Sequence, residues 1–173
     1  MIPIMNGPSV PWAILAANTP ARASVWFRKA LVALWDAGIA TGVDPAVLAG
    51  QCAHETGWGL FGGAVTADMG NTCGLKIRSP KADRKEDHAT FGNDRHGYPT
   101  KGARAHADHL RLYAGFPVDL STTHDPRAVF IQPGTPNFGR ARFVAHLGGL
   151  WAPALDYGMA VESKINILRG QVE

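Results

Sequence analysis

The feature that most constrains the fold is a helical spacing of apolar residues that occurs twice before a long glycine-rich segment. Apolar side chains recur at helical intervals from Ser24, a plausible helix cap, to Ile39, and the pattern ends at Gly42. Asp44 followed by Pro45 is a second start signal, because aspartate caps free amides and proline fits the first helical position. The sequence therefore predicts two consecutive helices, over 24–42 and from 44 to about 56.

The rest of the chain divides at glycines and prolines. Residues 57–63 are glycine-rich, and residues 64–101 are polar with only short apolar pieces. Helical spacing returns over 102–114, a short helix is expected after Asp125-Pro126, and a further helical piece is expected over about 140–147. The last helix should carry the apolar stripe of Tyr157, Val161, Ile165 and Leu168.

These elements predict an α+β protein that is mainly α-helical, with a small, loop-rich β lobe over 64–101. A chain of 173 residues with 46% apolar residues can bury one core, so we expect a single domain over 24–173. Residues 1–23 contain four prolines and little periodicity. We expect them to form an arm on the domain surface, with regular structure starting after it.

Charge and hydropathy exclude several classes of protein. The formal charge is +3, and Lys and Arg are scattered rather than clustered, so nucleic acid is not the expected partner. The apolar run over 10–17 is short and contains Pro11, so neither a membrane span nor a signal peptide is expected. Cys52 and Cys73 fit no zinc spacing, and we expect both to be free thiols.

Glu55 is the most unusual residue of the second helix. Leu48, Cys52 and Glu55 lie at i, i+4 and i+7, so a carboxylate continues an otherwise apolar stripe. Trp58 and several glycines follow, which places the carboxyl beside an open loop. Partial burial there would raise its pKa, as a proton donor to a glycosidic oxygen requires. The alternative is a frayed helix end that turns Glu55 into solvent.

Three short segments resemble one family. Gln51-Cys-Ala-His-Glu55-Thr-Gly-Trp-Gly59, Asn71-Thr-Cys-Gly-Leu-Lys76 and Trp151-Ala-Pro-Ala-Leu-Asp-Tyr157 resemble the motifs of glycoside hydrolase family seventy-three, over about residues 24–170. Cys73 departs from the family pattern, which has an aromatic residue there. The resemblance implies a lysozyme-like fold, and a peptidoglycan hydrolase that cleaves β-1,4 bonds between N-acetylglucosamine and N-acetylmuramic acid without a cofactor or metal.

By that resemblance Glu55 is the general acid that protonates the leaving oxygen. A second carboxylate would activate water or hold the developing positive charge, and its distance from Glu55 would decide the stereochemistry. The family pattern does not align with a single acid here, and the candidates are Asp87 first, Glu86 next, then Asp83 and Asp94. Alternatively, the acetamido group of the substrate takes this part.

Aromatic and amide side chains in or near the three segments are candidates for a sugar-binding groove, because aromatic faces stack on sugar rings and amides bond acetamido groups. These candidates are Trp58, Asn71, Phe91, Trp151 and Tyr157. Trp26 and Trp35 have helical spacing and are expected to be packing residues.

Other functions are open or disfavoured. His54-Glu55 lacks the second histidine of a zinc protease, because position 58 is Trp. His106 and His109 are three apart, and we expect two surface histidines rather than metal ligands. A muramidase, a lytic transglycosylase and a non-catalytic wall-binding or tail module remain alternatives. Without an export signal, we expect synthesis in the cytoplasm of a phage-infected host, and access to the wall through a holin or on a virion.

Overall fold

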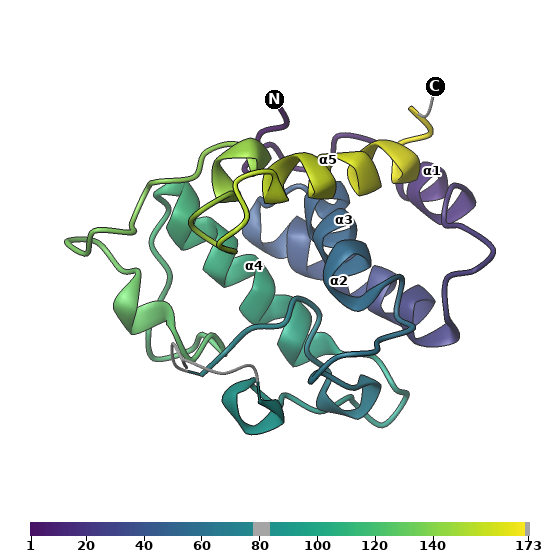
Figure 1. Cartoon of the computed structure of the whole chain (residues 1–173), viewed down its shortest axis with the longest axis horizontal. Helices are drawn as coiled ribbons and strands as arrows, with labels where there is room; N and C mark the ends of the chain where they lie inside the picture. Colours follow the sequence, from purple (N-terminus) through teal and green to yellow (C-terminus); the bar gives the residue numbers. More distant parts are fainter. Residues whose placement is uncertain (78–83, 172–173) are drawn as a thin grey trace.

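The computed structural model describes residues 1–77 and 84–171, and it is mainly α-helical, as the sequence predicts. In these residues five α-helices occur: α1 (Trp12–Ala17), α2 (Val25–Thr41), α3 (Pro45–Thr56), α4 (Thr100–Ala114) and α5 (Tyr157–Leu168) (Figure 1). Short 3-10 turns occupy Ala67–Met69, Lys85–Asp87, Ala128–Phe130 and Val144–Leu147. The pieces expected after Asp125-Pro126 and over 140–147 are therefore single turns.

The two predicted start signals act as expected. The Ser24 hydroxyl accepts a hydrogen bond from the Phe27 amide at 3.1 Å and begins α2. The Asp44 carboxylate accepts one from the Ala46 amide at 2.9 Å and begins α3, with Pro45 at its first position. These local bonds fix both helix boundaries.

Helix α3 lies between α2 and α5, and it holds the centre of the bundle (Figure 1). A β-carbon at Gly50 would lie 2.3 Å from Ile165, so glycine is required where α3 and α5 cross. Arg169, which lies directly after the end of α5, donates a hydrogen bond at 2.8 Å to Asp44 at the start of α3. Both contacts fix the direction in which α3 runs, and hence where its last turn lies.

The N-terminal arm corrects one expectation, because regular structure starts before residue 23. Helix α1 begins directly after Pro11, and Leu15 is fully buried. Ile4 is fully buried as well, and its backbone bonds Arg142 and Asp44. Residues 1–23 thus contribute to the core of the domain as well as to its surface.

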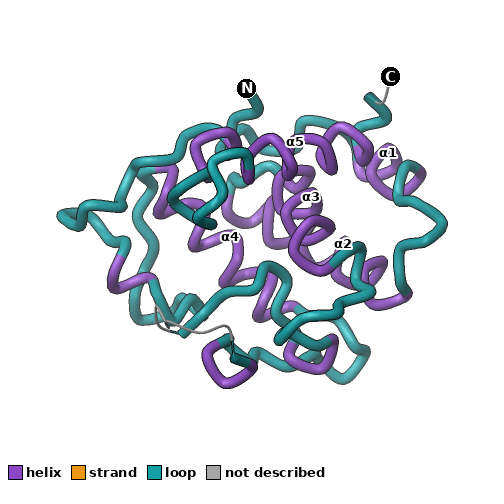
Figure 2. Tube along the Cα trace, in the orientation of Figure 1, coloured by secondary structure: helices purple, strands orange, loops and turns teal. Residues whose placement is uncertain are grey.

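The segment between α3 and α4 is mostly loop with short helical turns (Figure 2). Among its described residues the pairing of extended backbone is limited to one isolated bridge, between Lys76 and His88. It is flanked by hydrogen bonds from Ile77 to Asp87 and from Ala89 to Leu75. A mainly helical domain is confirmed, while the segment is less extended than a β lobe. No helix in the described ranges has the length and apolar character needed to cross a membrane.

Candidate active site

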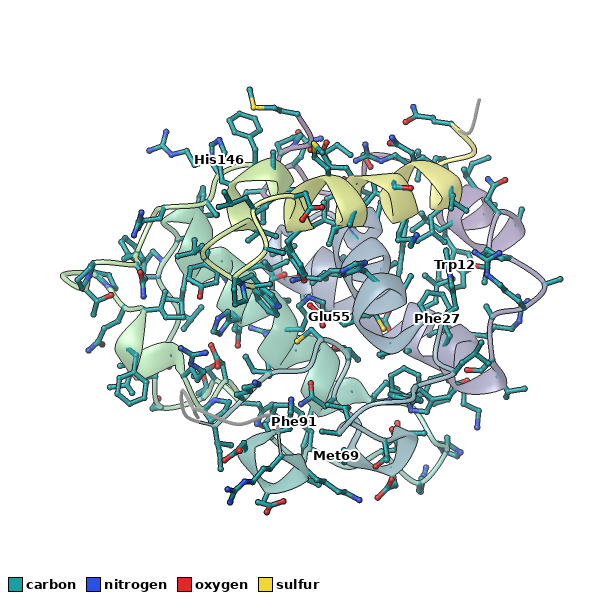
Figure 3. The ribbon with its side chains drawn as sticks, in the orientation of Figure 1. Trp12, Phe27, Glu55, Met69, Phe91 and His146 are labelled. Atoms are coloured by element: carbon teal, nitrogen blue, oxygen red, sulfur yellow. The ribbon has the colours of Figure 1, made fainter. Side chains whose placement is uncertain are left out.

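Glu55 lies in the last turn of α3 and lines a cleft of about 390 Å³. The labelled side chain lies between the helices and the loop segment that carries Met69 and Phe91 (Figure 3). The side chain of Glu55 is exposed to solvent, whereas its position in the apolar stripe of α3 predicts partial burial. The carboxyl is therefore open to a ligand in the cleft. The other lining residues are Thr56, Gly57, Phe61, Gly63, Ala64, Val65, Cys73, Gly74, Lys76, His88, Trp151, Ala152 and Pro153.

Two aromatic side chains hold one oxygen of the Glu55 carboxyl. The Tyr157 hydroxyl donates to Oε1 at 2.5 Å, and the Trp151 indole N–H donates to the same oxygen at 3.1 Å. Tyr157 begins α5, and Trp151 belongs to the loop before it. Hydrogen bonds to a charged group are among the stronger ones in proteins, so these two donors fix the rotamer of Glu55.

Asn71 builds the turn on the opposite side of Glu55. Its carbonyl oxygen accepts from the amides of Cys73 and Leu75, and its side-chain amide donates to the carbonyls of Leu75 and Ala89, all within 2.9–3.3 Å. The side chain is fully buried. Asn71 therefore shapes the loop and does not present its amide to a ligand.

Gly74 brings this turn against the catalytic candidate. Its φ of +66° is a left-handed conformation that glycine adopts without strain, and a β-carbon there would lie 3.5 Å from Glu55 Oε2. Glu55 Oε1 thus faces Tyr157 and Trp151, while Oε2 lies on the side of Gly74.

Trp151 belongs to two adjoining hollows. It lines the Glu55 cleft and a second hollow of about 120 Å³, which also contains His109, Tyr113 and Arg127. Its ring packs at 5.0 Å from the His109 ring and at 6.2 Å from the Tyr113 ring. Helix α4 therefore supports the tryptophan from behind. Of the predicted sugar-binding residues, Trp151 is the one in the cleft lining.

Trp58, Phe91 and Tyr157 lie outside the cleft lining. Trp58 is 4% exposed, and its ring packs 5.3 Å from Phe27, where it fixes the end of α3 against α2. Phe91 packs on the small cluster of Cys73, Leu75 and Ala105. Tyr157 is 5% exposed and contacts Glu55. Their aromatic character alone could not distinguish packing from ligand contact. Trp26 and Trp35 pack against the core, as expected.

The candidate second carboxylates are not in the described lining of the cleft. Asp87 is buried in a 3-10 turn, and Glu86 beside it is exposed. Asp94 accepts hydrogen bonds from the amides of Tyr98 and His96 and from Thr100, which lower its pKa and make it the organiser of the turn before α4. Asp83 lies outside the described residues.

His106 and His109 are buried, not at the surface as expected. His109 Nδ1 is 2.8 Å from Asp125 Oδ2, and His106 contacts Gln51 and Thr72. The prediction of surface histidines was wrong because each imidazole has a polar partner from a distant segment. These hydrogen bonds replace those to water and allow both rings to lie in the core. Within the described ranges, no group of three or more His, Cys, Asp or Glu side chains could hold a metal ion.

Several site residues were not found from the sequence. Lys76 and His88 line the cleft, and Gln51 donates a hydrogen bond to the Tyr157 hydroxyl at 2.8 Å. Gln51 had a usable signal, since it is a polar residue four positions before Glu55 on the same helix face. Lys76 ends the second motif, but nothing in the sequence places His88 beside it, because their pairing depends on how the loop folds.

The two cysteines are free, as predicted, and both are buried. Burial is the main reason that the pKa of each thiol lies well above its ordinary value, and the charge of Glu55 raises both further. Both thiols therefore stay protonated, so neither is a nucleophile although Cys73 lines the cleft.

Comparisons of the chain with protein-family models, with curated proteins and with solved structures found no match, so the family suggested by the three motifs stays a prediction.

Proposed function

We propose that this protein is a peptidoglycan hydrolase with Glu55 as its general acid, and that it cleaves the β-1,4 bond on the reducing side of N-acetylglucosamine. The observation that carries the proposal is a single carboxyl at a helix end, oriented by two donors and open to a cleft. A helical domain with its acid beside a loop segment is also the arrangement expected of a lysozyme-like fold.

The geometry suits proton donation to a glycosidic oxygen. A general acid must be held within hydrogen-bond reach of the leaving group, and the fixed rotamer of Glu55 provides that. Trp151 beside it offers an aromatic surface to a sugar ring.

The reaction then proceeds through a positively charged sugar, which either of two groups can stabilise. One is a second carboxylate, for which Asp87 and then Glu86 are the candidates, and the other is the acetamido group of the substrate.

The experiment is digestion of purified peptidoglycan, followed by borohydride reduction and mass spectrometry of the products. Reduced N-acetylglucosamine is expected. Muramitol would instead indicate a muramidase, and an anhydro sugar that resists reduction would indicate a transglycosylase. Absence of any sugar product would contradict enzymatic activity and support a non-catalytic wall-binding module.

A further inference from the structure

A chain of buried polar side chains runs from α4 to the catalytic candidate. Thr72 Oγ1 lies 3.2 Å from His106 Nδ1, and His106 Nε2 lies 2.9 Å from Gln51 Oε1. The Gln51 amide then donates to the Tyr157 hydroxyl at 2.8 Å, and that hydroxyl donates to Glu55. The chain joins four segments far apart in the sequence. General acid catalysis by Glu55 alone does not account for it.

Both titratable groups inside the chain are held neutral. Thr72, Gln51 and His106 are fully buried. Burial, and to a smaller extent His109, lowers the pKa of His106 to about 3. Burial, followed by the charge of Glu55, raises the pKa of Tyr157 well above its ordinary value. At neutral pH the imidazole therefore has one N–H, and the tyrosine keeps its hydroxyl proton.

Neutrality, together with the orientation of the Gln51 amide, fixes the direction of the hydrogen bonds from His106 to Glu55. Gln51 Oε1 can only accept, so the single proton of His106 must be on Nε2. Nδ1 is then the acceptor that faces Thr72 Oγ1, and the same hydroxyl also lies 3.4 Å from the Gly102 carbonyl oxygen. The Gln51 amide group points at the Tyr157 oxygen, which leaves the tyrosine proton directed at Glu55. The three donors from His106 to Tyr157 therefore point the same way, toward the carboxyl.

This direction has a consequence for Glu55. Its Oε1 accepts from both Tyr157 and Trp151, so a proton on that oxygen would compete with two donors. We propose that Gln51, His106 and Thr72 are positioning residues, whose bond chain makes Tyr157 an obligatory donor to Glu55 Oε1. This inference rests on the proposed role of Glu55.

Other titratable groups surround the chain and have to be considered in a pH experiment. His54 on α3 packs edge-on to Tyr157 at 5.2 Å, and burial together with Lys164 lowers its pKa. His109, paired with Asp125, is the neighbour of His106 on α4. Near Glu55 lie the protonated thiols of Cys52 and Cys73, and the cleft also contains Lys76 and His88. None of these side chains is changed in the variants below.

The first test needs no activity. In the wild-type protein, nitrogen NMR of the histidine rings should show His106 as the Nε2–H tautomer, with no titration between pH 8 and 5. A His106→Gln variant, in which the peak is lost, assigns the signal. An Nδ1–H tautomer, or titration near pH 6.5, would contradict the inference whatever the enzyme does.

The second test reverses the direction of the hydrogen bond between residue 51 and Tyr157. In Gln51→Glu the new carboxylate accepts from both Tyr157 and His106, so Tyr157 no longer donates to Glu55. Glu55 then keeps its proton to higher pH, and the alkaline limb of the pH–rate profile should move up by about one unit, with kcat lower by about tenfold and KM little changed. Gln51→Met removes the bonds without adding charge, and its shift should be smaller and in the same direction.

Matched controls separate positioning from folding. Gln171→Glu and Gln171→Met make the same changes at an exposed site outside the cleft and should leave the profile unchanged. His106→Gln, which can still donate to Gln51, should retain more activity than His106→Leu. An unmoved alkaline limb in folded Gln51 variants would overturn the positioning role. A wild-type protein that cleaves no glycan would instead overturn the proposed function, while the tautomer result would still test the chain.

Discussion

The two walls of the Glu55 cleft are built by different means. The helical wall consists of the end of α3, the start of α5 and Trp151, and its polar atoms are bonded to one another across the core. The loop wall, described over 61–77 and 84–88, contains the four hydrogen bonds of Asn71 and the isolated bridge between Lys76 and His88. The bonds of the helical wall therefore join separate helices, whereas the Asn71 bonds and the bridge join residues within the loop segment.

This difference suggests that the helical wall serves proton donation and the loop wall serves substrate binding. A proton donor has to be held in one orientation, because a small displacement lowers the rate strongly. The loop wall has to admit and release a glycan polymer, and a segment that can open locally suits that task. We expect changes in the helical wall to act on the chemical step, and changes in the loop wall to act on stability and substrate binding. The predictions below test this division in order of decreasing effect.

The largest effect is expected for Glu55→Gln, which keeps the shape and removes the transferable proton. The rate of peptidoglycan cleavage should fall about a thousandfold, or about 4 kcal/mol in activation free energy, with an unchanged circular dichroism spectrum. Glu162→Gln removes the same charge from α5 outside the cleft and should be silent. More than a tenth of the wild-type rate in the Glu55 variant would refute the assignment.

Asp87→Asn measures the contribution of the loop wall to the same reaction. The loss should exceed that for Glu86→Gln, Asp83→Asn or Asp94→Asn if a second carboxylate takes part, because Asp87 is the best candidate. Small and equal losses in the four variants would indicate assistance by the acetamido group of the substrate.

Asn71→Ala should destabilise the loop wall by about 3 kcal/mol, because it leaves several buried backbone groups without partners. Hydrogen exchange should rise over 71–77 and 87–91 while α3 and α5 stay protected. Asn93→Ala, at an exposed site with a single side-chain bond to Ala67, is the control. Uniform loss of protection would mean that the two walls unfold as one unit.

The lowered pKa of His106 predicts that the free energy of unfolding falls at acid pH. Its pKa is about 3 in the folded protein and near 6.5 in the unfolded chain, so the unfolded state binds the extra proton between these values. Its contribution is complete above pH 6.5 and is lost as the pH falls toward 3. Between pH 6.5 and 5 this loss should reach about 2 kcal/mol. Urea unfolding should show a smaller pH dependence in His106→Gln, and an unchanged one in His124→Gln, at an exposed site.

Trp151→Phe should have the smallest effect. It keeps an aromatic ring and removes one of two donors to Glu55, so the rate should fall about tenfold, or about 1.4 kcal/mol. Trp12→Phe on α1, outside the cleft, is the matched control. A loss as large as that of Glu55→Gln would show that Trp151 is needed for more than orientation.

The sequence predicted the elements whose causes are local. The helices after Ser24 and Asp44 begin and end where their caps and glycines require, and the helix of 102–114 and the last helix were found from apolar spacing. The short helix α1 was missed because six residues carry too little periodicity. Glu55 was singled out because one carboxylate interrupts an apolar stripe, which is visible without any tertiary contact.

Tertiary structure alone decided which side chains meet. Sequence spacing could not show that Tyr157 and Trp151 donate to the same oxygen of Glu55, that Asn71 is turned inward, or that His106 is buried against Gln51. The contacts of Glu55 and His106 join residues from separate elements, with partners up to about a hundred positions apart. Those of Asn71 depend on how the loop segment folds back on itself. Local propensity determines where a helix starts, whereas the partner of a buried polar group depends on how the helices cross, and packing at positions such as Gly50 sets that crossing.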